Sequence, residues 1–500
     1  MKLKDLIKSI ESHKIYTAGG NAAVIPDLDV ALISCNSREN LRDAIFIAIK
    51  GAQADGHAFI QDAIRRQAAA IVFEDSRRIT PQVINSKNES AHPILVQVPD
   101  SRSAMVHLAQ AFYGYPSRAF SVIGITGTNG KTTISYLIEA IVRKAGNNPA
   151  VIGTVNYRYN QKVLASGNTT PGPIELQRLF KEMFDGGVTH LAMEVSSHAL
   201  DQDRVAGINF SGAIFTNLTQ DHLDYHKGLE EYFKAKTKLF TNLDKDAFPV
   251  INNDDPYGKR LAQMCNQPVV TYGLDETAQV YASGISMDTD HTDFTLNGSG
   301  QEIKLRMHLI GRHNVYNVLG AAAWALKAGI SPGIIASAIE GFTSVPGRLE
   351  RIDGAGGIRV FVDYAHTEDA LSNVISTLRQ ITRNKIIVVF GCGGDRDKIK
   401  RPAMGRVVTD LSDYAVITSD NPRSEDPQAI IEDITRGITK KNYCIVPDRM
   451  VAIRTAVAKA DEGDVVLIAG KGHETYQIIK DNVLHFDDRE AVRECLKSRS

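Results

Sequence analysis

The chain has 500 residues, and this length is more than one hydrophobic core normally serves, so we expect about three domains. Hydrophobic residues make up 43% of the chain. Lys plus Arg number 57 and Asp plus Glu 58, so the net charge of −1 excludes a global attraction to nucleic acid or to anionic membranes. The five cysteines form no C-x-x-C pair, which favours a reducing compartment and argues against a structural zinc site. With no signal-peptide pattern and no long apolar run, we expect a cytoplasmic, soluble protein.

Short apolar runs alternate with helix-period segments along the chain, which is typical of α/β domains. The first region, residues 1–115, contains the candidate strands IFIAIKG, AAIVFED and PILVQVPD and ends at the turn-rich YGYPSRAF. The second region covers residues 116–344. The third, residues 345–500, follows a Pro-Gly break and contains five candidate strands, of which FVDYAH, IIVVFGC, AVITSD and VVLIAG end in polar or glycine-rich sequence. Ligands of open α/β sheets bind beyond such carboxyl ends, so we expect sites there.

The segment GITGTNGKTT, Gly124–Thr133, nearly matches a phosphate-binding loop, although its first glycine stands one residue earlier than the strict spacing requires. It joins a predicted buried strand, 120–126, to a predicted amphipathic helix, 133–146. A loop in this setting aims backbone N–H groups at an anion. Lys131 is then expected to neutralise the β- and γ-phosphates, and Thr132 to offer a hydroxyl to magnesium. The alternative is a glycine-rich turn with a solvated lysine.

Two further segments of the second region carry candidate magnesium ligands. Glu194 ends the predicted strand VTHLAMEV, where a carboxylate suits a nucleotide site but is also common as a solvated charge. His222 and His226 have i, i+4 spacing, yet no third ligand completes a zinc pattern. His222, which follows the strand-like AIFTNLT, is the better placed to join a magnesium site, unless it serves as a cap or a hydrogen-bonding group.

Lys236 lies on the apolar face of a helix predicted to begin near Leu229, whereas Lys234 and Lys238 point away from that face. An inward lysine either extends its ammonium to water, pairs with a buried carboxylate, or becomes a neutral amine of lowered pKa. A neutral amine reacts with carbon dioxide, and the resulting carbamate is an anionic magnesium ligand.

Nine motifs, in this order, resemble those of the Mur ligase family, the ATP-dependent amide-forming enzymes of peptidoglycan precursor synthesis: GTNGKTT, MEVSSHAL, TNLTQDHLDYH, GRHNVYNVLGA, PGRLE, VDYAHTEDAL, GCGGDRDKIKRP, DNPR and GKGHE. The resemblance covers nearly the whole chain. It implies three α/β domains: an N-terminal UDP-binding domain, a central P-loop ATPase-like parallel sheet with helices, and a C-terminal Rossmann-like domain that binds the amino acid. NTTPG, MEVSSH, DNPR and GKGHE are most similar to the enzymes that add the third residue of the peptide.

The resemblance implies that ATP phosphorylates the D-glutamate carboxylate of UDP-N-acetylmuramoyl-L-alanyl-D-glutamate and that an amine then displaces the phosphate. The residues it assigns to catalysis are Lys131, Glu194, His222 and Lys236, with magnesium held by Thr132, Glu194, His222 and the carbamate on Lys236. For ATP it assigns Gly127, Thr128, Asn129, Gly130, Lys131, Thr132, Thr133, Asn314, Asn317, Arg348 and Asp363. For the UDP-sugar peptide it assigns Ser37, Thr169, Thr170, Ser196, Gln202 and Arg204. Since Arg348 and Asp363 belong to the hinge and the third domain, closure of that domain is expected to complete the site.

The resemblance also indicates the amino acid, because DNPR is the signature of enzymes that add meso-diaminopimelate. It assigns Arg396, Asp420, Asn421, Pro422, Arg423, Gly470 and Glu474 to that substrate. Arg396 and Arg423 would each bind a carboxylate, and Glu474 an ammonium, so L-lysine should be rejected. In an unrelated protein, Asn421-Pro422 would simply form a turn.

The chain departs from the family pattern at Glu368, where proline is common, and at Ile399, where glycine is common. Within the superfamily, the alternatives are a folylpolyglutamate synthase and the enzyme that adds D-alanyl-D-alanine. A P-loop module that hydrolyses ATP without forming a bond is the alternative outside it. We expect small-molecule substrates, no nucleic acid partner, no membrane insertion and a monomer.

Overall fold

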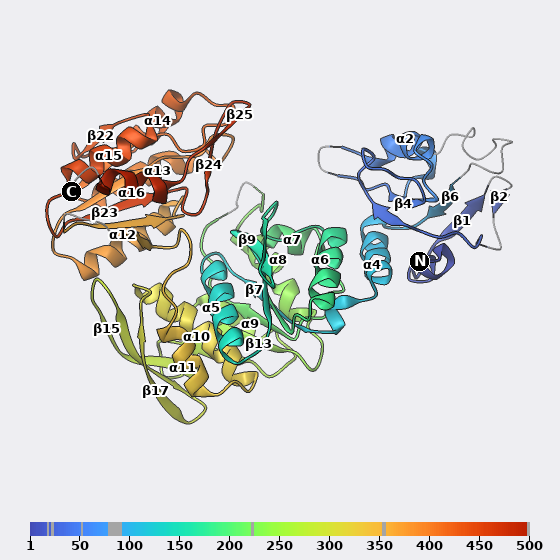
Figure 1. Ribbon diagram of the computed structural model, residues 1–500, viewed down its shortest axis with the longest axis horizontal. Helices are drawn as coiled ribbons and strands as arrows, with labels where there is room; N and C mark the ends of the chain where they lie inside the picture. The colour runs from blue at the N-terminus through green and yellow to red at the C-terminus, as the bar shows by residue number, and fades with distance from the viewer. Residues whose placement is uncertain are drawn as a thin grey trace.

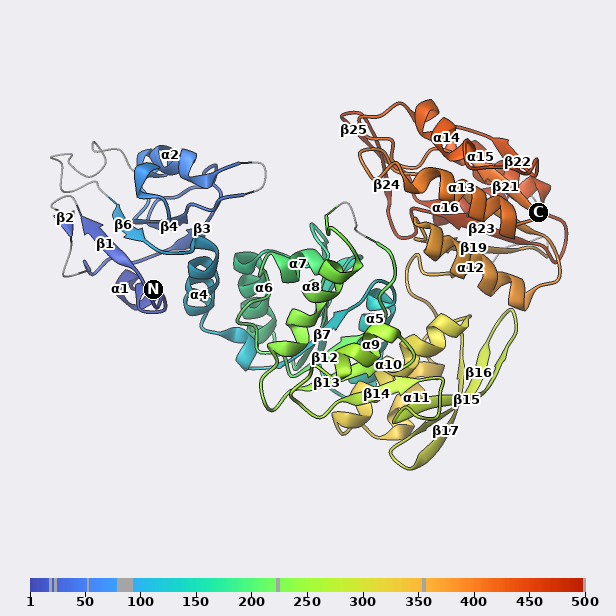
Figure 2. The ribbon, with the colours of Figure 1, turned by 180° about the vertical axis from the view of Figure 1, so that it is seen from behind.

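The computed structural model describes residues 1–17, 20–21, 25–51, 54–78, 93–221, 225–352 and 357–497. The chain forms three α/β units, each built on one main sheet, with the central unit between the N-terminal and C-terminal units (Figures 1 and 2). The predicted three-domain α/β fold is thus confirmed, while the domain boundaries at 115 and 344 stay a prediction.

The N-terminal unit has a six-stranded sheet in the order β2-β1-β6-β5-β4-β3. The pairs from β3 to β6 are parallel, and β1 runs antiparallel to β6. Helices α1 and α4 pack on one face and α2 on the other. The elements are β1 (Lys14–Thr17), β2 (Gly20–Asn21), β3 (Leu32–Ser34), β4 (Ala44–Ile47), β5 (Ala70–Phe73), β6 (Ile94–Gln97), α1 (Leu3–Ile7), α2 (Ile60–Arg65) and α4 (Ser101–Tyr113). The three strands predicted here are confirmed as β4, β5 and β6.

The central unit has an eleven-stranded sheet in the order β10-β9-β8-β11-β7-β12-β13-β14-β15-β16-β17. The strands from β8 to β15 are parallel, and antiparallel hairpins extend both edges. The strands are β7 (Ser121–Thr126), β8 (Pro149–Ile152), β9 (Asn156–Tyr159), β10 (Lys162–Ala165), β11 (His190–Glu194), β12 (Gly212–Phe215), β13 (Phe248–Asn252), β14 (Val270–Gly273), β15 (Val280–Met287), β16 (Thr292–Gly298) and β17 (Gln301–Met307). Strand β7 lies between β11 and β12, so the loop after it opens at the point where the chain switches sides of the sheet.

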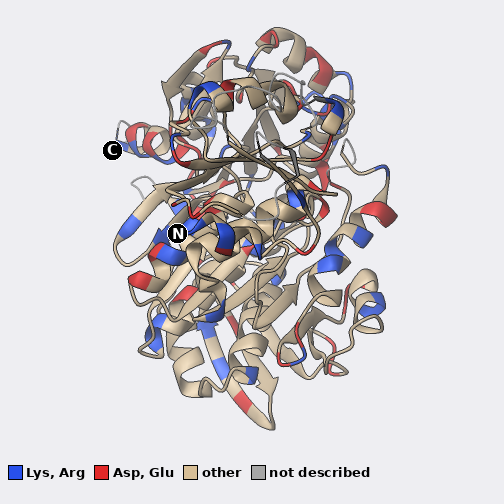
Figure 3. Cartoon of the chain, turned by 90° about the vertical axis from the view of Figure 1, so that its right-hand side faces the viewer, with Lys and Arg blue, Asp and Glu red and all other residues tan. Residues whose placement is uncertain are grey.

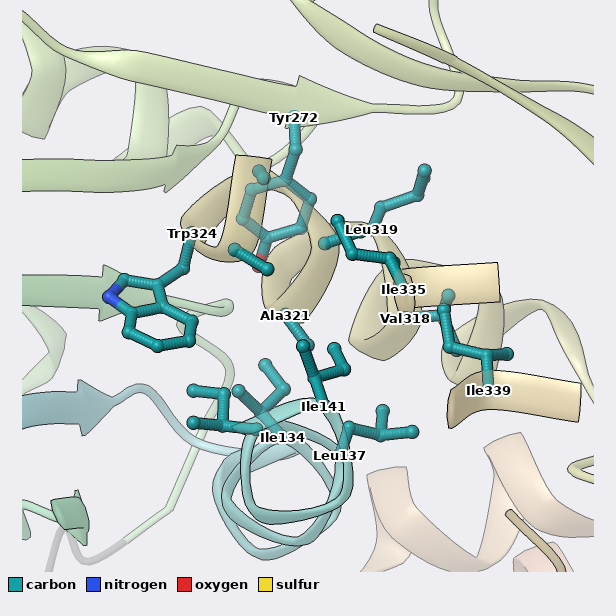
Figure 4. Close-up of a cluster of buried hydrophobic side chains, with 14 of the residues drawn as sticks. Ile134, Leu137, Ile141, Tyr272, Val318, Leu319, Ala321, Trp324, Ile335 and Ile339 are labelled. Carbon is teal, nitrogen blue, oxygen red and sulfur yellow. The ribbon is translucent and has the colours of Figure 1, made fainter. Parts of the chain in front are cut away.

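Among the residues that the structure describes, seven helices cover the two faces of the parallel part of this sheet. On one face lie α5 (Lys131–Lys144), α10 (Arg312–Lys327) and α11 (Pro332–Glu340). Figure 4 shows Ile134, Leu137 and Ile141 of α5 pointing toward α10, as the periodicity of the segment predicts. The opposite face packs against α6 (Pro173–Asp185), α7 (Ser197–Asp201), α8 (Leu229–Thr241) and α9 (Pro256–Ala262). The two packed faces hold the loop after β7 in a fixed position.

The C-terminal unit has a six-stranded sheet in the order β18-β19-β23-β20-β21-β22, parallel except for β18. Helices α12, α13 and α14 cover one face, and α15 and α16 cover the other. The elements are β18 (Glu350–Ile352), β19 (Arg359–Asp363), β20 (Ile386–Phe390), β21 (Tyr414–Ile417), β22 (Tyr443–Ile445), β23 (Val465–Ala469), the separate hairpin β24 (Tyr476–Ile479) and β25 (Asn482–His485), α12 (Glu368–Ile381), α13 (Lys400–Leu411), α14 (Pro427–Thr435), α15 (Arg449–Lys459) and α16 (Asp488–Lys497). The four strands predicted to end in polar sequence are confirmed as β19, β20, β21 and β23.

A buried ion pair joins α15 to α16. Arg449 Nε and Nη2 each donate to the Asp488 carboxylate at 2.7 Å, and both side chains are fully buried. Replacing Arg449 with leucine leaves a buried carboxylate without its cation, so we expect the C-terminal unit to lose about 3–5 kcal/mol of stability. Scanning calorimetry measures this as a lower transition temperature. The control is Arg454→Ala, which removes an exposed pair with Glu494 in the same two helices and should change little. Equal effects of the two variants would contradict the prediction.

In the view of Figure 3, residues of both charge signs, Lys and Arg as well as Asp and Glu, are interspersed over the helices and loops. This distribution agrees with the nearly balanced charge of the sequence. Within the described ranges, no helix combines the length and the apolar character needed to cross a bilayer.

Candidate active site

The loop after β7 presents the start of α5 to a cavity. The helix begins at Lys131 without a side-chain cap, so the N–H groups of its first turn are left for another acceptor. Two loop N–H groups are already used, since Thr128 N donates to Asn217 O at 2.8 Å and Asn129 N to Asn217 Oδ1 at 2.9 Å. Asn217 therefore fixes the loop, and the N–H groups at the start of α5 are left in a geometry that suits an anion.

The unusual spacing of the loop has a packing explanation. Gly124 lies inside β7, where an added Cβ would come within 2.9 Å of the Phe210 ring. Gly127 is the first glycine of the loop itself, with φ of 143° and only 1.8 Å between an added Cβ and Thr216 Oγ1. The two glycines therefore have separate functions, the first in the core and the second in the turn.

Two lysines meet at the carbonyl oxygen of Gly127. Lys131 Nζ donates to Gly127 O and to Thr128 O at 2.8 Å, and Lys236 Nζ donates to Gly127 O at 2.9 Å. Lys236 is 1% exposed, as its place on the apolar face of α8 predicts, while Lys234 is exposed. Because Lys236 is buried, its ammonium does not extend to water. Among the described residues, no carboxylate lies within ion-pair distance of Lys236, so a buried ion pair does not explain its position either. Burial, followed by the charge of Lys131, holds the pKa of Lys236 well below its ordinary value.

Glu194 ends β11 as predicted and is 1% exposed, so it is not a solvated charge. Its Oε2 accepts hydrogen bonds from Thr132 Oγ1 at 3.1 Å and Thr154 Oγ1 at 3.0 Å, and its Oε1 accepts one from Thr154 N at 3.0 Å. Gly153 makes this position possible, because an added Cβ there would lie 2.2 Å from Glu194 Oε1. The carboxylate is therefore held beside the phosphate loop.

The adjacent oxygens of Thr132 and Glu194 fit magnesium, which prefers oxygen ligands and retains several waters. The described residues contain no group of three or more His, Cys, Asp or Glu side chains that could bind a metal, so the fit rests on these two groups together with Lys236. The proposed ligand His222 lies outside the described residues. His226, the other histidine of the pair, is buried with its Nε2 at 3.0 Å from Ser197 Oγ.

Asn314 and Asn317, two of the residues predicted to bind ATP, lie on α10 and are buried. Asn314 Nδ2 donates to Ile310 O at 2.9 Å, and Asn317 Nδ2 donates to Asn314 Oδ1 at 3.0 Å. Arg348 reaches the same cavity from the C-terminal unit, with Nη2 donating to Thr132 Oγ1 at 3.3 Å. Asp363 accepts hydrogen bonds from Leu349 N at 2.6 Å and Ala365 N at 2.7 Å, and burial raises its pKa. Asp363 therefore holds the hinge loop that carries Arg348.

Two adjoining cavities lie between the central and C-terminal units. One of about 500 Å³ is lined by the phosphate loop from Thr128 to Thr133 and by Glu194, Lys236, Asn314, Asn317, Arg348 and Asp363. A larger, open cleft of about 1540 Å³ is lined by Arg396, Asp420, Asn421, Arg423, Gly470 and Glu474, and also by Thr169. Both are lined by Thr154, Asp221 and Tyr364. Groups bound in the two cavities can therefore approach one another.

The DNPR loop follows β21 and packs against the loop after β23, and both loops line the larger cleft. Asn421 Nδ2 donates to Glu474 Oε2 at 2.8 Å, and an added Cβ at Gly470 would lie 2.6 Å from Asp420 Oδ2. Arg423 has φ of 51°, an uncommon conformation for a non-glycine residue, and its Nη1 donates to Gly394 O at 2.8 Å. Pro422 lies between these contacts. The loop is therefore tied down on both sides.

Two guanidinium groups of this cleft keep N–H donors that form no ion pair among the described residues. Among the described residues, neither Arg396 nor Arg423 forms an ion pair with a carboxylate, whereas neighbouring Arg401 is fully buried and pairs with Glu425 and Asp433. Arg401 is thus structural, and the other two remain available for anions. Burial, followed by the charge of Asp420, raises the pKa of Glu474.

The residues predicted to bind the UDP-sugar peptide are only partly brought together. Thr170 Oγ1 donates to Glu194 O at 2.9 Å and accepts from Ser196 N at 3.0 Å, so it fixes the carboxyl end of β11. Arg204 donates to Thr170 O at 3.0 Å and to Gln202 Oε1 at 2.7 Å. Ser196 also caps α7. Ser37 lies in the N-terminal unit, after β3, and does not line either of the two cavities described above.

Several site residues were not identified from the sequence, notably Gly153, Thr154 and Tyr364. Gly153 and Thr154 follow β8, so the rule that sites lie at carboxyl strand ends could have indicated them. Tyr364 lies within the motif VDYAH, but an uncharged side chain does not by itself indicate a binding or catalytic role. The departure at Glu368 has a local explanation, since it begins α12, where a carboxylate favours the helix dipole. Ile399 is 87% exposed beside the cleft.

The chain is similar to known proteins over its whole length. Models described as Mur ligase family, catalytic domain, as Mur ligase middle domain and as Mur ligase, glutamate ligase domain match residues 29–113, 125–325 and 347–472. A curated UDP-N-acetylmuramoyl-L-alanyl-D-glutamate--2,6-diaminopimelate ligase from Geobacillus thermodenitrificans (strain NG80-2) is 44% identical over all of both chains.

Solved structures are also similar to this chain over nearly its whole length. The structure of a UDP-N-acetylmuramoyl-L-alanyl-D-glutamate--2,6-diaminopimelate ligase has a TM-score of 0.67 at 31% identity, covering 95% of this chain and 97% of the other. The MurF ligase from Thermotoga maritima in complex with ADP has a TM-score of 0.64 at 18% identity, covering 95% of this chain and all of the other, which is a likeness of fold alone.

Proposed function

The chain belongs to the Mur ligase family, and from that membership we propose that it joins meso-2,6-diaminopimelate to UDP-N-acetylmuramoyl-L-alanyl-D-glutamate, with ATP converted to ADP and phosphate, in peptidoglycan precursor synthesis. The observation that carries the choice of amino acid is the pair Arg396 and Arg423, which have no carboxylate partner among the described residues and line the same cleft as Glu474. Diaminopimelate has two carboxylates, which match the two arginines, and two ammonium groups, one of which matches the Glu474 carboxylate.

The reaction needs an activated carboxylate, because a carboxylate ion is a poor electrophile. Its oxygen attacks the γ-phosphorus of ATP, the bond to the β-phosphate oxygen breaks, and an acyl phosphate forms. The amine nitrogen then bonds to the acyl carbon, loses a proton, and inorganic phosphate leaves. Exclusion of water between the two units protects the acyl phosphate from hydrolysis.

The phosphate-side residues act by charge and position. The first-turn N–H groups of α5 bind the phosphates, and Lys131 exchanges its two carbonyl acceptors for phosphate oxygens of greater negative charge. Arg348, already at 3.3 Å from Thr132, supplies a second cation from the C-terminal unit. Thr132, Glu194, His222 and the carbamate on Lys236 would hold Mg²⁺, which would supply positive charge to neutralise the phosphoryl group that is transferred.

The position of the Glu194 carboxylate is expected to be critical. In Gly153→Ala the new methyl group would stand 2.2 Å from Glu194 Oε1, so the carboxylate must move. A displacement of about 1 Å at a reacting centre can cost about 10²-fold in rate, and we expect a loss of that order in kcat for phosphate release. Gly167→Ala, at another cleft glycine with no atom within 4 Å of the added Cβ, is the matched control. A Gly153→Ala enzyme of normal kcat would contradict the role given to Glu194.

Lys236 carries a carbamate in the active enzyme. Only a neutral amine attacks carbon dioxide; the new N–C bond forms with loss of one proton, and the lowered pKa of Lys236 makes the neutral form more available than in an ordinary lysine. Carbamate occupancy therefore rises with pH and levels off above the lowered pKa. Carbon-13 NMR with labelled bicarbonate should show a carbamate signal that is missing from Lys236→Ala. An identical spectrum for both proteins would remove the carbamate from the mechanism.

The experiment that tests the function measures phosphate release with ATP, magnesium and the UDP dipeptide substrate, with diaminopimelate, L-lysine or no amino acid, together with the product mass. Release and a tripeptide mass only with diaminopimelate support the proposal. Preference for lysine would keep the ligase reaction but refute the role of the paired arginines. Turnover without any amine would favour a P-loop ATPase module. A cytoplasmic location and a monomeric state remain part of the proposal.

A further inference from the structure

Tyr364 stands at the junction of the two cavities. The Arg348 guanidinium lies over its ring, 4.7 Å from the centroid, and the same arginine donates to Thr132 of the phosphate loop. Tyr364 lines both the phosphate-side cavity and the larger cleft. The ring therefore supports an arginine that reaches from the hinge to the phosphate loop.

The hydroxyl group of Tyr364 contacts the other side of the site. It donates a hydrogen bond to Glu474 Oε1 at 3.4 Å, while Glu474 Oε2 accepts from Asn421 and, at 3.4 Å, from Lys471 Nζ. Burial, followed by the charge of Glu474, raises the pKa of the Tyr364 phenol, so the hydroxyl stays a neutral donor. The Glu474 carboxylate is thus oriented by three different side chains.

The backbone around Tyr364 leaves it little freedom. Tyr364 N donates to Gly347 O at 2.9 Å, and a Cβ added at Gly472 would lie 2.7 Å from the Tyr364 Cβ. The His473 ring packs against the Tyr364 ring at a centroid distance of 5.1 Å. Contacts from the hinge and from the loop after β23 therefore fix the side chain in place.

We infer that Tyr364 is a positioning residue with two separable tasks: its ring holds Arg348 for ATP, and its hydroxyl orients Glu474 for an ammonium group of the incoming amino acid. The inference rests on the proposed function. Tyr364 touches none of the reacting groups in this scheme, so its effects pass through Arg348 and Glu474.

Two substitutions separate the tasks. Tyr364→Phe keeps the ring and removes the hydroxyl, so we expect KM for diaminopimelate to rise about fivefold, the effect of one hydrogen bond, with KM for ATP within about twofold. Tyr364→Leu removes both contacts and should raise both KM values. Tyr159→Phe, which removes a tyrosine–carboxylate hydrogen bond to Glu182 at a residue that lines neither cavity, is the matched control and should change neither KM.

A double-mutant cycle with Glu474→Ala tests the path of the effect. If the hydroxyl acts through Glu474, Tyr364→Phe should add less than about twofold in that background. An unchanged KM for diaminopimelate in Tyr364→Phe, an equal rise in both KM values, or a full fivefold effect in the Glu474→Ala background would each overturn the inference. Thermal unfolding confirms that the variants fold. If the wild-type chain itself fails to use diaminopimelate, the proposed function fails; if it does and Tyr364→Phe behaves normally, only this inference fails.

Discussion

Replacing Lys236 with alanine is expected to lower kcat for tripeptide formation by about 10³-fold, with KM for the UDP substrate and diaminopimelate within about threefold. The size of the loss follows from removing an anionic ligand that would help to hold magnesium beside the transferred phosphoryl group, in a site where one charge-stabilising contact contributes about 10²–10³ in rate. Lys236 is 1% exposed and lies 2.9 Å from the Gly127 carbonyl of the phosphate loop. Initial rates of phosphate release at saturating substrates measure the effect.

The helix that carries Lys236 supplies the control. Lys234 is two residues away in α8 but exposed, so Lys234→Ala should retain nearly full activity. A short carboxylate such as acetate can enter the space that the shortened side chain leaves and stand in for the carbamate oxygens, so added acetate should restore part of kcat in Lys236→Ala. A Lys236→Ala enzyme with normal kcat would show that neither the amine nor its carbamate takes part in the phosphoryl step.

Replacing Arg423 with alanine is expected to lower kcat/KM for diaminopimelate by about 10³-fold and to abolish the preference over L-lysine. Diaminopimelate differs from lysine by one carboxylate, and a site built to bind that group discriminates strongly because an unmatched polar group is left without partners. Arg423 is suited to this task because its backbone is held at φ of 51° and its Nη1 is fixed on Gly394 O at 2.8 Å. Competition assays with both amino acids measure the ratio of the two kcat/KM values.

The neighbouring helix α13 offers a matched arginine. Arg406 is exposed and lines neither cavity, so Arg406→Ala should leave the ratio unchanged. Arg423→Lys keeps the charge but loses the forked geometry, and an intermediate ratio is expected. If Arg423→Ala still selected diaminopimelate as strongly as the unmodified chain, the distal carboxylate would have to bind elsewhere, and the paired-arginine explanation would be wrong.

Much of the site could be predicted because its signals are local. The inward direction of Lys236 follows from its spacing to Tyr232 and Phe240 along one helix, and the place of Glu194 follows from the end of an apolar strand. The strands that end in polar sequence were also found, because parallel strands buried on both faces form continuous apolar runs.

What could not be predicted depends on contacts between distant segments. Gly153 matters only because Glu194, from another strand, lies beside it, and Tyr364 only because Arg348 and Glu474 meet at its two ends. The hairpins at both edges of the central sheet were missed for the same reason, since pairing with a neighbour defines an edge strand. Ser37 was predicted to lie in the first domain, and the structure places it there, after β3; its role in binding the UDP group stays a prediction.

The residues assigned to the incoming amino acid lie between Arg396 and Glu474, all on loops at the carboxyl ends of β20, β21 and β23. Those assigned to phosphoryl transfer belong almost entirely to the central unit, on β11, on the loop after β7 and on α5, α8 and α10. If these assignments hold, selectivity and phosphoryl transfer belong to separate units, and exchange of the C-terminal unit for that of a lysine-adding relative should transfer the choice of amino acid without rebuilding the phosphate loop. With the two functions on separate units, the amino acid that is added to the polymer precursor can change while the chemistry that activates the carboxylate stays the same.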